Sequence, residues 1–178
     1  MPSAKTHDAI TFMLAAPAAA AAYAATWRVP AALIVGLSFL FGGLMFGPDL
    51  DTVSRQYSRW GVLRFLWLPY RHFFPHRSRF SHGLILGAVL RVFYFAGAVT
   101  LVTFLIAYLY SSYRGGRPPG PDDIGTVWRP IGTFVDAHLG GSDFYLFGFV
   151  GVWFGAASHT FTDLAGSFIK TGRIAKFF

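Results

Sequence analysis

The chain has 178 residues, of which 54% are hydrophobic and 19% aromatic, and its formal net charge is +7. This composition is typical of an integral membrane protein, and the absence of cysteine excludes disulfides, thiolate nucleophiles and cysteine-based zinc sites. The basic residues flank apolar stretches and form no patch on a soluble recognition fold. Their position is typical of basic residues that determine how a protein is oriented in a membrane, and we expect no nucleic-acid partner.

Four apolar stretches predict an all-α integral membrane protein with a single membrane domain. Each approaches or exceeds the ~20 residues that a helix needs to cross ~30 Å of hydrocarbon. The predicted spans cover about residues 9–27, 30–47, 83–110 and 144–169. The first two form a helical hairpin around a short turn at Arg28.

The N-terminus has an alternative interpretation. Lys5 followed by an Ala-rich stretch resembles a secretory signal peptide, whose cleavage near residues 18–22 would remove His7. The apolar stretch is longer than that of a normal signal peptide, so we expect the first span to be retained.

Two connections differ in character. Residues 52–75 interleave arginines with large apolar side chains, which predicts an amphipathic helix in the lipid headgroup layer. A solvated basic loop is the alternative, but it would expose too many apolar residues. Residues 111–143 are rich in Gly and Pro and predict an irregular loop with a short helix near 126–138.

Charge asymmetry predicts the orientation. With four spans, the N-terminus, residues 48–82 and the C-terminus share one side and carry ten Lys and Arg residues, against four on the other side. Because positive residues concentrate in cytoplasmic segments, both termini are predicted to be cytoplasmic, in the inner (plasma) membrane of a bacterium.

Blocks rich in His and Asp lie on that same side of the apolar stretches. One follows the second span, one precedes the third, one lies late in the fourth, and a further histidine opens the first. Placing His and Asp side chains near the hydrocarbon of a bilayer costs free energy, and metal coordination is a usual way to offset that cost. The predicted metal ligands are His7, Asp49, Asp51, His76, His82, His159 and Asp163.

Each block also allows a simpler interpretation. Asp49 and Asp51 are two residues apart in a turn, so they could hold one cation or bridge two, or one could cap a helix while the other is solvated. His159 and Asp163 share a helix face and could ligate one metal, or form a hydrogen bond that satisfies two buried groups.

Seven ligands exceed the three or four that a catalytic zinc uses. They predict two divalent ions, or one ion with outer His–Asp pairs. This set of nitrogen and oxygen ligands without sulfur suits Zn, Mn or Fe better than Mg alone, and Zn is the ion that we expect first. His72 and His138 are weaker candidates, at an interface and in a solvated loop. Arg91 lies inside the third span, where Asp163 or a bound anion is its expected partner.

Together with Arg59-Trp-Gly and Trp67-Leu-Pro-Tyr70, these blocks resemble a bacterial family of uncharacterised metal-binding membrane proteins. That family is similar in its His and Asp blocks to the LexA-regulated, membrane-bound metal-dependent hydrolases. The resemblance spans nearly the whole chain in order, although Ala4 stands where the family's opening has Gly. It implies the same seven ligands and supplies no substrate.

Two functions follow from these observations. The first is a membrane-embedded metal-dependent hydrolase that acts on a phosphoester or lipid phosphate at the cytoplasmic face. Its predicted catalytic residues are Asp51, His82, Arg77 and Arg79, although the two arginines could instead bind anionic headgroups. The second is a non-catalytic membrane protein with a structural or sensing metal. Transport is disfavoured because the first three spans offer almost no polar groups at their centres.

Overall fold

The computed structural model describes residues 2–76 and 78–172, and every regular element in that part of the chain is helical. This confirms the predicted all-α class, and four helical stretches are long and apolar enough to cross a membrane. They are α1 (Ala4–Thr26), α2 (Val29–Leu44) together with the helical chain that continues it to Asp51, α6 (Leu86–Tyr113) and α8 (Ser142–Thr171). The shorter helical segments are η1 (Pro48–Asp51), α3 (Arg55–Ser58), η2 (Gly61–Trp67), α4 (Leu68–Phe73), α5 (Arg79–His82), η3 (Pro121–Val127) and α7 (Arg129–His138).

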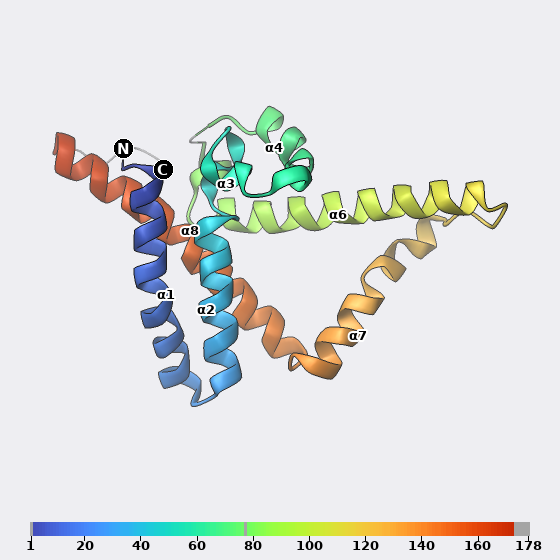
Figure 1. The fold of residues 1–178 in the computed structure, drawn as a ribbon, viewed down its shortest axis with the longest axis horizontal. Helices are drawn as coiled ribbons and strands as arrows, with labels where there is room; N and C mark the ends of the chain where they lie inside the picture. Colours follow the sequence, from blue (N-terminus) through green and yellow to red (C-terminus); the bar gives the residue numbers. More distant parts are fainter. Residues whose placement is uncertain (1, 77, 173–178) are drawn as a thin grey trace.

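Helices α1 and α2 form the expected hairpin (Figure 1). Ser3 caps α1 by accepting a hydrogen bond from the Thr6 backbone N–H at 3.2 Å. Trp27 ends the helix in the left-handed region, with φ of 56°. Pro30 then lies in the first turn of α2, where its fixed φ favours helix initiation. The chain therefore reverses within a few residues.

Glycines let α2 and α8 pack closely, with α2 also packed against α1. A Cβ atom on Gly42 would lie 2.3 Å from the Val152 carbonyl oxygen, and one on Gly155 would lie 2.1 Å from the Phe39 carbonyl oxygen. Small residues allow such backbone contact between apolar helices. This packing brings the end of α2, which leads into η1, against the middle of α8.

Residues 52–75 form a cap of short segments, α3, η2 and α4, instead of the single interfacial helix predicted from the sequence. Trp67 and Tyr70 are fully buried in an aromatic core, where the Trp67 ring stacks on Phe95 of α6 at 5.6 Å. Pro69 restarts the helix as α4. The large apolar residues of this segment that stay exposed are Val53, Val62, Leu63, Phe65, Leu68 and Phe73.

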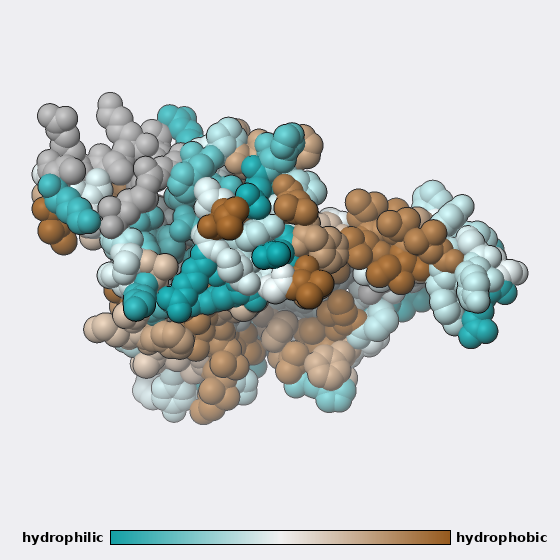
Figure 2. Space-filling model, turned by 45° about the horizontal axis from the view of Figure 1, so that its top comes forward, coloured by the Kyte–Doolittle hydropathy of each residue, from teal (hydrophilic) through white to brown (hydrophobic). Residues whose placement is uncertain are grey.

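Helix α6 leaves this core in a different direction from the other long helices. It contacts chiefly α5, η2 and η3, and it runs across the axis of α1 and α2 before α7 returns the chain to the start of α8 (Figure 1). Hydrophilic residues gather over the cap end, while apolar surface covers the lower part of the molecule and the arm formed by α6 (Figure 2).

Candidate metal centre

The structure brings all seven predicted ligands together at one end of the α1, α2 and α8 packing. They are supplied by four helical segments and one turn: α1, η1, the turn before α5, α5 and α8. Contacts of 2.9–3.8 Å between imidazole nitrogens and carboxylate oxygens link the seven side chains into one continuous cluster.

The first part of the cluster joins α1 to α8. The Nε2 atom of His7 lies 3.2 Å from Oδ1 of Asp163, and the His7 and His159 rings stack with centroids 3.8 Å apart. The Nε2 atom of His159 lies 3.8 Å from Oδ2 of Asp163. All three side chains are buried, and each offers one ligand atom within 4.8 Å of the other two.

The second part consists of Asp49, His76 and His82, which also offer ligand atoms within 4.8 Å of one another. The Nε2 atom of His82 lies 3.5 Å from Oδ1 of Asp49. Behind them, Asp51 contacts Nδ1 of His76 at 2.9 Å and Nδ1 of His82 at 3.6 Å. A carboxylate against this ring nitrogen orients a histidine for coordination through the other one.

Asp49 connects the two parts. Its Oδ1 atom faces His82, while its Oδ2 atom lies 3.2 Å from Nε2 of His159. The two oxygens of one carboxylate therefore face two different groups of ligands. Asp49 thus belongs to both parts of the cluster.

Buried polar atoms without hydrogen bonds show that the donor set fits a metal. Among the described residues, such atoms in the cluster include His7 Nδ1, Asp51 Oδ2, His159 Nε2 and Asp163 Oδ1. Leaving a buried polar atom unsatisfied costs about 1–3 kcal/mol, so an accumulation of them calls for a partner. Imidazole nitrogens and carboxylate oxygens suit Zn, Mn or Fe.

Gln56 is part of the site and was missed by sequence reasoning. This buried side chain donates through Nε2 to the Gly43 carbonyl at 2.8 Å, and the same atom lies 3.3 Å from Nδ1 of His159. Its Oε1 atom accepts from the Asp49 backbone N–H at 3.1 Å. Gly47 permits this approach, because a Cβ atom there would lie 2.2 Å from Gln56 Nε2. Gln56 thus orients residues of both parts of the cluster.

Arg91 supports the second part from α6. Its side chain is 2% exposed and donates to the backbone carbonyl of Ser81, whose hydroxyl lies 3.0 Å from Nδ1 of His82. The sequence led us to expect Asp163 or a bound anion as the partner of Arg91, but in the structure Arg91 binds the backbone of α5. Burial raises the pKa of the neighbouring Tyr70 phenol, and the Arg91 charge opposes that rise.

The remaining sequence candidates do not join the cluster. His72 is exposed beside the ring of Phe73, and His138 is exposed on α7, stacked on Phe134. Arg79 is exposed and does not line the cavity at the cluster. Arg77 lies outside the described residues.

Two other arginines, Arg55 and Arg59, line the cavity at the cluster. Arg59 binds Asp8 through both carboxylate oxygens, at 2.9 and 2.6 Å, and also donates to the Leu44 carbonyl at 2.8 Å. Arg55 contacts the same Asp8 carboxylate at 3.2 Å. Both arginines line a cavity of about 230 Å³ that is also lined by candidate ligands from both parts of the cluster.

Comparison of the sequence with known proteins also points to metal binding. Residues 2–173 match the family described as uncharacterized metal-binding protein (DUF2227). An uncharacterized protein of Aquifex aeolicus (strain VF5) is 36% identical over 69 residues, which are 38% of this chain and 45% of the relative, so the match spans less than half of the relative's length. No solved structure matches significantly. Because the family match covers nearly the whole sequence, the chain belongs to the DUF2227 family of metal-binding proteins.

Proposed function

We propose that the protein is a membrane-embedded hydrolase with two divalent ions, which cleaves a phosphoester at the cytoplasmic face. The observation that carries this proposal is the position of Asp49, whose two carboxylate oxygens face separate groups of ligands. Carboxylate-bridged ion pairs are a recurrent solution for phosphoester hydrolysis.

The first ion would be held by His7, His159 and Asp163, and the second by His76 and His82. Asp49 would be shared between them. Two divalent ions at such a site supply Lewis-acid activation of water and of a phosphoryl oxygen. Zn is favoured by the histidine content, with Mn or Fe as alternatives.

The chain's own residues supply orientation and proton handling. Asp51 is buried and contacts Nδ1 of both His76 and His82, so it fixes both rings and is placed to hold a proton released during hydrolysis. His76 is the most exposed member of this group, with a side chain 41% exposed. A proton taken up by the Asp51–His76 pair therefore has a short route to solvent.

The membrane location rests on the four long apolar helices and on the excess of basic residues at the end that carries the cluster. In this orientation the cluster lies at the depth of lipid headgroups. A phosphate carried by a lipid is therefore the substrate that reaches the site most directly. The LexA-regulated hydrolases, which the sequence resembles, are consistent with this chemistry.

A structural metal is the second candidate, and one observation favours it. The cluster ties α1, η1, α5 and α8 together through buried side chains, so bound ions would stabilise the fold even without turnover.

Turnover separates the two functions. Metal-loaded protein in detergent is assayed with bis-p-nitrophenyl phosphate and dioctanoyl phosphatidic acid. The hydrolase predicts turnover that Asp51→Asn lowers at least ~100-fold, the order expected for loss of an acid–base group, while the fold is kept. Asp136→Asn, at an exposed carboxylate on α7, is the matched control. If the wild type has no turnover and Asp51→Asn only lowers thermal stability, the metal is structural.

A further inference from the structure

The cavity beside the cluster has two chemically different walls. One part of its lining consists of His7, Asp49, His76, His159 and Asp163 of the cluster, and another consists of residues of α3 and of the turns that flank it. Its volume, about 230 Å³, is smaller than the roughly 300–1,000 Å³ of sites that enclose a drug-sized ligand. The cavity therefore suits one compact polar group placed against the cluster.

Most of the polar groups on the second wall are already engaged. The hydroxyls of Thr52 and Ser54 donate to the Asp49 carbonyl at 3.3 and 2.8 Å. Gln56 is committed to Gly43, His159 and Asp49, as described above. Arg59 is held by both oxygens of Asp8 and by a backbone carbonyl. These groups form the wall of the cavity and offer little to a ligand.

Arg55 is the exception. In the described part of the chain, the only ion pair or side-chain hydrogen bond of Arg55 runs from NH1 to Oδ2 of Asp8, at 3.2 Å. The Nε and NH2 donors are unpaired there, and the side chain is 51% exposed. Because one Asp8 carboxylate faces both Arg55 and Arg59, it does not neutralise both guanidinium groups. A guanidinium with free donors is well matched to a phosphate, which accepts two hydrogen bonds from it.

We propose that Arg55 anchors a phosphate-binding subsite in this cavity, so that the ligand's phosphate lies between Arg55 and the metal centre. The inference rests on the proposed function and assigns to Arg55 the anion recognition that the sequence had predicted for Arg77 and Arg79. Asp8 holds the guanidinium through NH1, and the Arg55 side chain lines the cavity.

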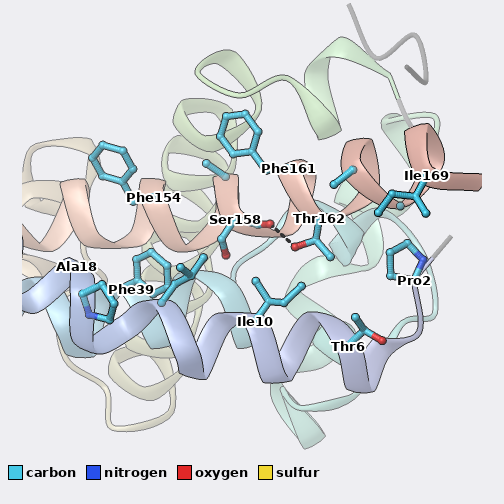
Figure 3. A pocket seen from close by; sticks show the side chains of 15 residues that line it. Pro2, Thr6, Ile10, Ala18, Phe39, Phe154, Ser158, Phe161, Thr162 and Ile169 are labelled. Atoms are coloured by element: carbon cyan, nitrogen blue, oxygen red, sulfur yellow. Dashed lines mark hydrogen bonds between the residues drawn. The ribbon is translucent and has the colours of Figure 1, made fainter. Parts of the chain in front are cut away.

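An apolar groove next to this subsite raises the question of whether the phosphate belongs to a lipid or to a water-soluble molecule. It lies between α1 and α8, has a volume of about 660 Å³, and shares Pro2 with the polar cavity (Figure 3). On α8, Ser158 and Thr162 line the groove while His159 and Asp163, one residue further on, line the cavity. The phosphate could thus belong to a lipid, with its acyl chain in the groove, or to a water-soluble molecule.

Calorimetric titration of the metal-loaded full-length protein tests the subsite. The probes are inorganic phosphate and dioctanoyl phosphatidic acid. Arg55→Gln is expected to weaken binding of both probes roughly 10–100-fold, the loss of charge-assisted hydrogen bonds, and Arg55→Lys to weaken it less. Arg64→Gln removes the same charge from an exposed position on η2 that does not line the cavity, and it should bind both probes as the wild type does.

The metal content of each variant separates this proposal from the proposed function. If Arg55→Gln keeps the wild-type metal content and binds phosphate as tightly as the wild type, the subsite is wrong while the metal centre stands. If the wild type binds no metal, the hydrolase proposal fails, and a phosphate affinity that still depends on Arg55 supports the subsite alone. Tighter binding of the lipid than of inorganic phosphate, lost in Ala165→Trp in the groove, identifies a lipid source; equal binding identifies a soluble one.

Discussion

At the scale of single residues, Asp49 is the side chain on which a two-ion site depends, because each of its oxygens faces a different histidine. Asp49→Asn keeps the shape but replaces one oxygen by an amide group that cannot coordinate in the same way. We expect the bound metal to fall from two ions per chain to one or fewer, measured by elemental analysis. Two ions retained in this variant would show that Asp49 is not shared.

Gln56 gives a second prediction at this scale. Gln56→Leu removes its contacts to His159 and to the Asp49 backbone while keeping a similar side-chain volume. Loss of a group that orients metal ligands typically lowers affinity ~10–100-fold, and we expect a loss in this range by chelator competition. An unchanged affinity would mean that His159 is oriented by its other neighbours.

Sequence reasoning found the seven clustered residues because their type is informative. His and Asp next to apolar spans require a compensating interaction, whatever the details of the fold. Gln56 and Arg55 carry no such signal, since polar and basic residues are common in any connection between helices. Their roles depend on how α3 folds back over the end of α2, which only long-range contacts determine.

At the scale of secondary-structure elements, the glycine contacts between α2 and α8 set the distance between the two halves of the cluster. Gly155→Ala places a Cβ atom 2.1 Å from the Phe39 carbonyl oxygen, so the helices must move apart. Overpacking of this kind costs typically ~1–3 kcal/mol. We expect a lower thermal unfolding midpoint and reduced metal content.

Gly97→Ala is the control for this substitution. Gly97 lies on α6, and a Cβ atom there would meet nothing within 4 Å. The same chemical change should therefore leave stability and metal content unaltered. Equal effects of the two substitutions would contradict a specific role for the α2–α8 contact.

The four long helices could be predicted from the sequence, but the cap could not. Length and continuous apolar character are local properties, which are sufficient to recognise such helices. The mixture of aromatic and basic residues in 52–75 fits a headgroup layer and an internal aromatic core equally well. The burial of Trp67 against Phe95 and of Tyr70 against Tyr94, both on α6, depends on long-range contacts that this mixture does not reveal.

At the scale of the whole molecule, the direction of α6 is the test of the four-span topology, because this helix runs crosswise to α1 and α2 and away from them (Figure 1). The chain has no cysteine, so single substitutions can be labelled selectively. With four spans, Ser58→Cys in the cap reacts with a membrane-impermeant maleimide from the cytoplasmic side, and Ser112→Cys at the end of α6 reacts from the opposite side. Labelling of both from one side would contradict four spans.

The number of bound ions is the quantity on which the hydrolase, the shared carboxylate and the site geometry all depend. Elemental analysis of the purified wild type should give two divalent ions per chain. His159→Ala and His76→Ala, which remove one ligand from each part of the cluster, should each leave about one ion. A wild type with no ion, or with a single ion that either substitution removes completely, would contradict a two-metal centre.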